Sequence, residues 1–263
     1  TSTAPQAILR ASRETEDFDE ELMTPVNIHV QTLPAPEFGD MEPAHCLSVI
    51  ESLAIPVFSK KRFLLSLGGE HSVSIPLISA ANKTFKDVAV LHIDAHADFR
   101  KKYQGSEYSH ACVMRRVEEM GLAFVSAGIR SFSACEYAHM KQNNTLGRIV
   151  YARNMSRCPI RKSLEQIKGI LSGSACTYIT LDIDALDPSL APGTGTPEPG
   201  GLSWDSLLQI LRSVFESQTV VGADIVETSP VPGTQVTEYT AARLALKMML
   251  YHQSLSPGRR PER

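Results

Sequence analysis

The sequence predicts an α/β protein with a central, mostly parallel sheet that helices cover on both faces. Beyond residue 60, short apolar segments alternate with longer segments of helical periodicity. The apolar segments are nearly continuous in hydrophobicity, which is typical of strands buried on both faces of a parallel sheet. Because such sheets carry their sites beyond the carboxyl ends of the strands, the residues after each apolar segment are the candidates for function.

The predicted elements follow one another without an internal repeat or linker, so we expect a single domain over residues 1–263. The predicted strands are 62–69, 88–94, 123–129, 148–152, 176–184 and 220–227. The predicted helices are 74–85, 110–121, 133–144, 163–172, 203–217 and 237–252. Residues 1–60 contain the acidic run EDFDEE and several prolines, and we expect them to be largely irregular around short helices.

Composition excludes several classes of protein. The formal net charge of −3 predicts no general affinity for nucleic acid or for anionic membranes. No apolar run approaches the roughly 18 residues of a membrane-spanning helix, and the first residues lack the basic and apolar regions of a signal peptide. Five scattered cysteines without a CxxC pair indicate free thiols in a reducing compartment, so a cytoplasmic protein is expected.

The nonapeptide HIDAHADFR at 92–100 places Asp94, His96 and Asp98 in strict alternation at the end of a predicted strand. The side-chain period of two in a strand would put all three on one face. Two carboxylates and an imidazole on one surface repel one another and lose hydration, unless a cation lies between them. Taken alone, the motif fits a solvated strand end as well as it fits half of a metal site.

Other strand ends enlarge this set. His71 follows the first strand, and Asp182 and Asp184 end the fifth at positions i and i+2. If the sheet brings these ends together, the four aspartates cannot all be ionised without cations among them. Two divalent ions that share bridging carboxylates would use the whole set. A ligand set of carboxylates with two imidazoles and no thiolate favours manganese over zinc. Two adjacent Mn²⁺ ions would activate a water molecule for hydrolysis.

Five motifs resemble the ureohydrolase family, which includes arginase and agmatinase: GGEHS (68–72), DAHAD (94–98), SHA (109–111), DIDALDPSLAPGTGTPEPGGL (182–202) and DIVETSP (224–230). The likeness runs from about residue 62 to 251. It implies a three-layer α/β/α, arginase-like fold and two Mn²⁺ ions per subunit. It also implies a homo-oligomer that hydrolyses a guanidino group to an amine and urea through a hydroxide bridging the two ions.

The resemblance also implies a role for each matching residue. One ion would be held by His71, Asp94, Asp98 and Asp182, and the other by His96, Asp94, Asp182 and Asp184. Glu227 matches the glutamate that binds the guanidinium of the substrate. His110 matches the histidine that shuttles protons, so His110 and Asp98 are the predicted catalytic residues.

The resemblance implies a small guanidino compound as the substrate, and the loop FRKKYQGSEYSHA (99–111) bears on which one. This loop lacks the Ser-Gly-Asn sequence with which arginases bind the α-carboxylate and amine of arginine. Its EYSH run (107–110) resembles the agmatinase branch, so the predicted reaction converts agmatine to putrescine and urea, a step of polyamine biosynthesis. Arginine and guanidino acids such as guanidinobutyrate stay open, because related branches share most of these motifs. Arg100, Lys101 and Lys102 in the loop could favour a substrate that carries a carboxylate, but we interpret them as solvated loop charges.

Two other classes of protein also stay open. A zinc deacetylase could share the fold, although a single zinc needs only about three protein ligands. A non-catalytic metal-binding subunit is also conceivable, but it would need neither His110 nor Glu227. Family members carry an earlier strand and a Gly/Pro/Arg-rich loop before the helix that PQAILRAS resembles, whereas TSTA precedes it directly here. The N-terminal part of the domain is therefore expected to be incomplete.

Overall fold

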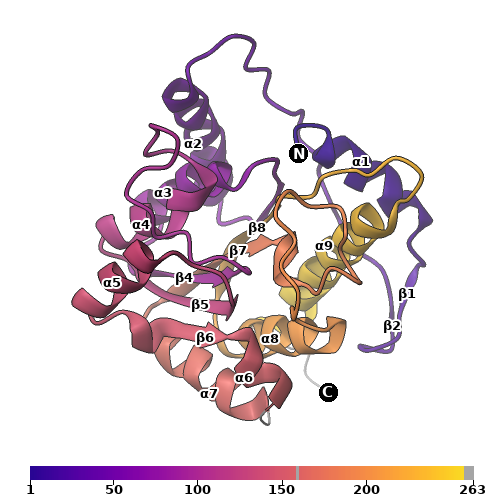
Figure 1. Cartoon of the computed structure of the whole chain (residues 1–263). Coiled ribbons are helices and arrows are strands. Elements are labelled where there is room, and N and C mark those ends of the chain that lie inside the picture. The colour runs from indigo at the N-terminus through magenta and orange to yellow at the C-terminus, as the bar shows by residue number, and fades with distance from the viewer. Residues whose placement is uncertain (158–159, 258–263) are drawn as a thin grey trace.

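The computed structural model describes residues 1–157 and 160–257. At its centre lies a six-stranded sheet in the order β3-β8-β7-β4-β5-β6 (Figure 1). Every neighbouring pair in this sheet is parallel. The strands are β3 (Leu64–Leu67), β4 (Val88–Ile93), β5 (Ala123–Ile129), β6 (Ile149–Tyr151), β7 (Cys176–Asp182) and β8 (Val220–Val226). Each predicted strand is thus present, and the parallel arrangement is confirmed.

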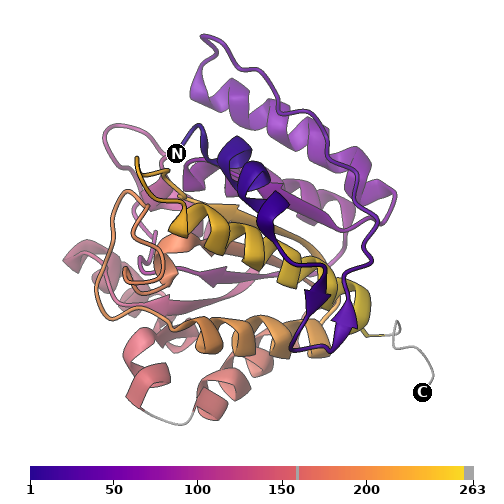
Figure 2. The same ribbon diagram turned by 90° about the vertical axis from the view of Figure 1, so that its right-hand side faces the viewer.

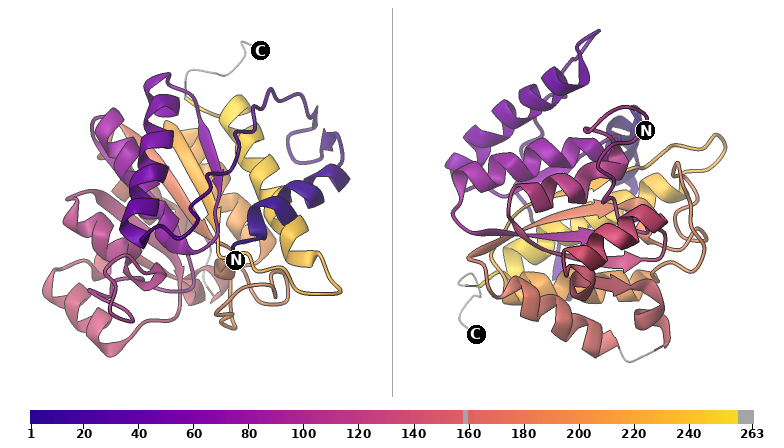
Figure 3. Two further views of the ribbon diagram at one scale, coloured as in Figure 1. Left: turned by 90° about the horizontal axis from the view of Figure 1, so that it is seen from above. Right: turned by 60° about the vertical axis from the view of Figure 1, so that its left-hand side comes forward.

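Helices cover both faces of the sheet, which confirms the three-layer α/β/α fold. One layer consists of α2 (Pro43–Ser59), α3 (Ser74–Thr84), α4 (Val113–Glu119) and α5 (Ala134–Gln142). The other consists of α1 (Ala4–Ala11), α6 (Ala152–Arg157), α7 (Ile160–Leu171), α8 (Trp204–Ser217) and α9 (Val236–Ser254). Figure 2 shows α1, α8 and α9 in front of the sheet, and the left view of Figure 3 shows the sheet between the two layers.

Alternation along the strands supplies a separate hydrophobic core to each layer. In β4, Leu91 and Ile93 belong to the core beneath α7–α9, whereas Val88 and Val90 belong to the core beneath α2–α5. All residues of β4, β7 and β8 are buried, because these strands occupy the middle of the sheet. The middle strands therefore form a rigid base, and their carboxyl ends meet at one edge.

The N-terminal region is more regular than the sequence predicts. The expectation of irregular structure over residues 1–60 is wrong for α2, which runs for 17 residues. Its apolar residues do not follow a clear helical period and Pro56 lies inside it, so the usual sequence signals are weak. The short helix α6 was also not predicted, and the predicted helix 110–121 divides into a 3₁₀ turn (His110–Cys112) and α4.

The acidic run EDFDEE joins the N-terminal region to α9. It overlaps an antiparallel hairpin of β1 (Phe18–Asp19) and β2 (Thr24–Pro25). Lys247 of α9 is buried and lies 2.7 Å from Asp19 and 3.2 Å from Glu21. These ion pairs attach the hairpin to the helical layer. Among the described residues, no helix combines the length and apolarity needed to cross a bilayer.

Candidate metal centre

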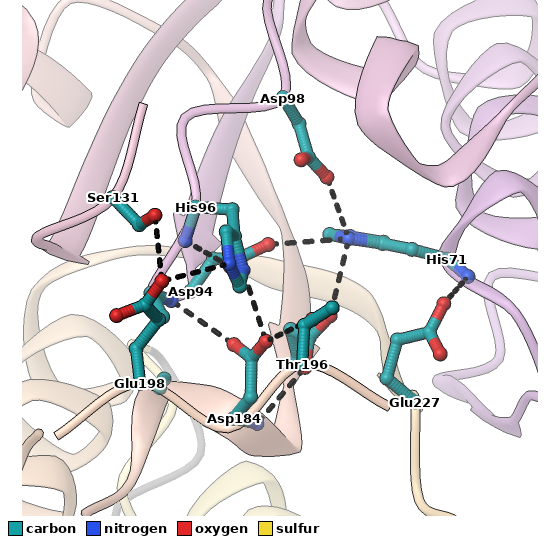
Figure 4. Close-up of polar contacts among 12 residues, drawn as sticks. His71, Asp94, His96, Asp98, Ser131, Asp184, Thr196, Glu198 and Glu227 are labelled. Atoms are coloured by element: carbon teal, nitrogen blue, oxygen red, sulfur yellow. Dashed lines mark hydrogen bonds and ion pairs between the residues drawn. The ribbon is translucent and has the colours of Figure 1, made fainter. Parts of the chain in front are cut away.

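The predicted metal ligands converge at the carboxyl edge of the sheet (Figure 4). Asp94 follows β4, Asp182 ends β7, and the two strands are hydrogen-bonded neighbours. His71 begins a 3₁₀ turn (His71–Val73) shortly after β3. The other three predicted ligands, His96, Asp98 and Asp184, lie in the loops that follow these strands. The side chains therefore come from three separate segments of the chain and are brought together by the strand order.

The side chains of Asp94, His96 and Asp98 in HIDAHADFR do converge on the candidate site, but strand alternation is not the reason. The strand β4 ends at Ile93, so His96 and Asp98 belong to a loop. This loop is held beside β5, because Asp94 N donates to Ala127 O and Ala97 N donates to Ser131 O. Asp98 has a φ of 55°, in the left-handed region that few non-glycine residues adopt. This conformation brings its carboxylate to 3.0 Å from the His71 ring.

Asp184 likewise does not extend a strand, since β7 ends at Asp182. It lies in a 3₁₀ turn (Ile183–Ala185), and Asp182 caps this turn by accepting a hydrogen bond from Asp184 N at 2.9 Å. The Asp184 carboxylate accepts from Ala95 N at 3.1 Å and approaches His96 Nδ1 to 3.0 Å. The turn therefore connects the loop after β7 directly to the loop after β4.

His71 provides the clearest sign of a cation site. Its Nε2 lies 3.0 Å from Thr180 Oγ1, and that hydroxyl donates to Asp224 at 2.7 Å, so Nε2 carries the proton. Its Nδ1 is buried and makes no hydrogen bond to the described residues. Nevertheless this nitrogen lies 3.2 Å from Asp94, 3.0 Å from Asp98 and 3.5 Å from Asp182. A neutral imidazole here would turn a lone pair towards three carboxylates, which is unfavourable unless a proton or a metal cation lies among them.

The described part of the chain contains two groups of potential ligand atoms, and Asp94 belongs to both. One group combines Asp94 with His71 and Asp98, and the other combines it with His96 and Asp184. His92 is close enough to join the first group. However, its Nε2 donates to Asp94 at 2.9 Å and its Nδ1 accepts from Ser126 at 3.1 Å. We therefore interpret His92 as a residue that orients Asp94.

The electrostatics also favour cations. Burial and the charges of Asp184 and Asp94 raise the pKa of Asp182 well above its ordinary value. Burial opposes a charge on His71, but Asp94 and Asp98 outweigh it and hold the pKa of His71 well above its usual value. In the same way, Asp184 and Asp94 outweigh burial and raise the pKa of His96 to about 11. The raised pKa values favour protonation of Asp182, His71 and His96, because the surrounding carboxylates need a compensating positive charge. Divalent ions bound among these side chains would replace the protons.

Glu227 and His110 both line the same cavity as the carboxylates, which has a volume of about 550 Å³. Glu227 accepts a hydrogen bond from His71 N at 2.7 Å, and burial raises its pKa. His110 Nδ1 donates to Glu70 at 2.9 Å, and its backbone N–H donates to the same oxygen at 3.0 Å. Glu70 is therefore the residue that orients His110, and it raises the pKa of that imidazole.

Comparison with known proteins identifies the family of this fold and site. The model of the arginase family matches residues 1–251.

The chain belongs to the arginase family.

Three similar proteins illustrate the range of this arginase family. N(1)-aminopropylagmatine ureohydrolase of Synechocystis sp. is 35% identical, over 94% of this chain and 81% of its own length. Agmatinase of Halalkalibacterium halodurans is 33% identical, over 94% of this chain and 84% of its own length. The crystal structure of formimidoylglutamase from Bacillus subtilis superposes on this chain with a TM-score of 0.88 and 26% sequence identity. The match covers 97% of this chain and 82% of the formimidoylglutamase chain. The predicted resemblance to the ureohydrolases is confirmed, as is the prediction of a hydrolytic enzyme of that type.

Arg130 is a residue of this arginase-family site that the sequence analysis missed. It follows β5 directly, and its guanidinium donates to the backbone carbonyls of Asp184 and Glu198 at 2.7 Å each. It thereby holds the loop that carries Asp184. Its position just beyond a buried strand is the same signal that identified the other candidates.

Proposed function

We propose that this chain hydrolyses the guanidino group of agmatine to putrescine and urea, with two Mn²⁺ ions as cofactors. The observation that carries the proposal is the His71 Nδ1 atom, which faces three carboxylates without a hydrogen bond among the described residues. The residues that would hold the ions are His71, Asp94, His96, Asp98, Asp182 and Asp184. When bound, two such ions would supply a water nucleophile near neutral pH.

The residues around the cluster support a role in substrate binding and proton transfer. Glu227 lies next to His71, and its carboxylate can form paired hydrogen bonds with a guanidinium. Such a cation would favour the ionised form of Glu227, which burial otherwise disfavours. His110 is half-exposed at the cavity wall, so it can exchange protons with solvent and deliver one to the leaving amine.

The names of two relatives support a substrate that carries an amine at the end opposite its guanidino group. Two of the proteins compared above are named for agmatine or its aminopropyl derivative. Both compounds combine a guanidino group with an aliphatic amine and carry no carboxylate. Manganese as the metal, a homo-oligomer and a cytoplasmic location stay predictions from the sequence.

A guanidino acid is a second candidate substrate, and Arg100 is the observation that favours it. Arg100 lines the cavity, so it is not merely a solvated loop charge. Its side chain is 40% exposed and lies near Glu136, with its guanidinium 5.2 Å from the ring centre of Tyr103. A carboxylate on the substrate could pair with this cation.

The test is urea release by manganese-loaded protein from agmatine, arginine, guanidinobutyrate and guanidinopropionate, with the metal content measured by mass spectrometry. We expect two ions per chain and a strong preference for agmatine. A preference for a guanidino acid would keep the site and assign the second candidate. No urea from any compound, with two ions bound, would reject the proposed function and favour the deacetylase or non-catalytic alternatives.

A further inference from the structure

Glu136 is a buried carboxylate in the wall of the candidate active-site cavity, and it is not one of the predicted metal ligands. It is 4% exposed and lies in the first turn of α5. The guanidinium of Arg100 approaches it only to 3.9 Å. A carboxylate buried to this extent is tolerated when hydrogen-bond donors satisfy its oxygens. The donors that reach Glu136 therefore indicate what the residue does.

One oxygen of Glu136 caps α5. Its Oε2 accepts from Ser133 N and from Ser133 Oγ, each at 2.7 Å. Ser133 Oγ in turn accepts from Glu136 N at 3.3 Å, so the two residues form a capping box. The sequence SACE (133–136) carries the local pattern of this motif. The cap occupies only this one oxygen, and the other is left for a different partner.

The other oxygen of Glu136 holds the loop that carries Asp98. Its Oε1 accepts from Phe99 N at 3.0 Å, and the two residues are 37 positions apart in the sequence. The carbonyl of the same peptide group, Asp98 O, accepts from Arg115 N at 3.2 Å. The peptide between Asp98 and Phe99 is thus hydrogen-bonded at both ends, and Glu136 is the side chain that binds it.

This peptide follows a backbone conformation that needs support from its surroundings. Asp98 has a φ of 55°, and a non-glycine residue keeps such a conformation only where the neighbouring structure enforces it. The conformation turns the Asp98 carboxylate towards His71, with 3.0 Å between Oδ2 and Nδ1 (Figure 4). A change in the orientation of the peptide would therefore move a predicted metal ligand.

We propose that Glu136 is a positioning residue of the metal centre: it fixes the peptide after Asp98 and thereby holds this carboxylate at the ion that it shares with His71. This inference rests on the proposed function, because it assumes two bound ions. The ligands of the other ion include His96 and Asp184 but not Asp98. The two ions should therefore respond differently to a change at Glu136.

Two substitutions separate the metal role of Glu136 from its role in the helix cap. Glu136→Gln keeps an oxygen for Ser133, since glutamine also forms capping boxes. However, its amide nitrogen would then face Phe99 N, and two donors cannot bond to each other. Ser133→Ala removes the hydroxyl of the cap and leaves the Glu136 carboxylate free to accept from Phe99 N. Glu136→Gln should therefore loosen Asp98, whereas Ser133→Ala should weaken only the start of α5.

The experiment is calorimetric titration of the metal-free proteins with Mn²⁺, together with electron paramagnetic resonance of the loaded proteins. We expect Glu136→Gln to weaken one of the two binding steps about 10- to 100-fold and to leave the other nearly unchanged. Its spectrum should then show isolated Mn²⁺ in place of a coupled pair. Glu136→Asp, whose shorter side chain cannot span both partners, is a second variant and should lose the same ion. Ser133→Ala should bind both ions as the unsubstituted protein does.

The outcomes separate this inference from the proposed function. Unchanged binding of both ions in Glu136→Gln and Glu136→Asp would overturn the positioning role and leave the metal centre standing. Equal weakening in Ser133→Ala would assign the effect to the helix cap and would also overturn it. An unsubstituted protein that binds fewer than two Mn²⁺ ions would reject the proposed function, and the role of Glu136 with it. Selective loss of one ion in the Glu136 variants alone would support the proposal.

Discussion

His110 lies at the cavity wall, where Glu70 fixes its imidazole and 43% of its side chain stays exposed. We predict that His110→Asn leaves the metal content unchanged and lowers kcat by about 10²- to 10⁴-fold, because only proton transfer is lost. The measurements are saturating urea release and metal analysis. The matched control His45→Asn changes an exposed histidine outside this cavity and should be neutral. Unchanged turnover in His110→Asn would remove its proposed role.

Glu70 controls the protonation of His110, so the pair makes a pH-dependent prediction. The carboxylate stabilises the imidazolium and raises the pKa of His110. Glu70→Gln removes that charge, so the imidazolium loses its proton at lower pH. We expect the alkaline limb of the kcat profile, where the shuttle is deprotonated, to move to lower pH. Glu107→Gln is the control, since Glu107 pairs with Lys102 and Arg116 instead. An unmoved limb in Glu70→Gln would contradict this account.

The convergence of the candidate site residues could be predicted from the sequence, but their local geometry could not. Parallel strands bring their carboxyl ends to one edge, so the residues just beyond the apolar segments lie close together. The position of Asp98 depends on a left-handed backbone, and that of Asp184 on a 3₁₀ turn. Neither follows from a period of two. Arg130 also follows a strand end, but a cation there does not resemble a metal ligand, and its backbone-carbonyl partners leave no pattern in the sequence.

At the scale of elements, the close approach of β4 and β5 positions Asp94. Gly128 of β5 has a φ of 93°, and a Cβ there would lie 2.9 Å from the carbonyl oxygen of Asp94. We predict that Gly128→Ala lowers the free energy of unfolding by about 1–3 kcal/mol. It should also weaken metal binding, because the backbone of a shared ligand is displaced. Chemical denaturation and calorimetric metal titration measure the two effects.

Gly121 is the matched control for this prediction. It also has a positive φ, 72°, but an added Cβ would meet no atom within 4 Å. Gly121→Ala should therefore destabilise the fold through backbone strain alone and leave metal affinity unchanged. Equal metal affinities in the two variants would show that the approach of β5 to Asp94 does not position the ligand.

The elements themselves were predictable to different degrees for physical reasons. The six strands of the central sheet are apolar, the middle ones are buried throughout, and α8 has a clear amphipathic period, so the local sequence identifies these elements. The helix α2 contacts α3 and is apolar around most of its circumference, so its sequence resembles an irregular apolar segment. Its helical state depends on tertiary packing that no local pattern records.

For the whole molecule, the cluster of buried carboxylates and histidines links metal binding to stability and pH. Without cations, the folded protein holds protons on His71, His96 and Asp182 with raised pKa values. A raised pKa stabilises the fold fully below the pKa of the unfolded state, and this contribution is lost as pH rises towards the folded value. For the histidines the loss begins above about pH 6.5. The metal-free protein should therefore lose stability as pH rises above about 6.5 towards the raised pKa of His96, about 11.

Cations reverse this trend, because they replace the protons and bind more tightly as the ligands are deprotonated. We expect the difference in Tm between manganese-loaded and metal-free protein to widen from pH 6 to pH 9. Thermal unfolding with and without a chelator measures this difference, and restoring Mn²⁺ after chelation controls for irreversible damage. A Tm difference that stays constant or narrows over this range would show that the charges of the cluster are not what binds the metal. A widening Tm difference would show that bound cations offset the destabilisation caused by burying these carboxylates.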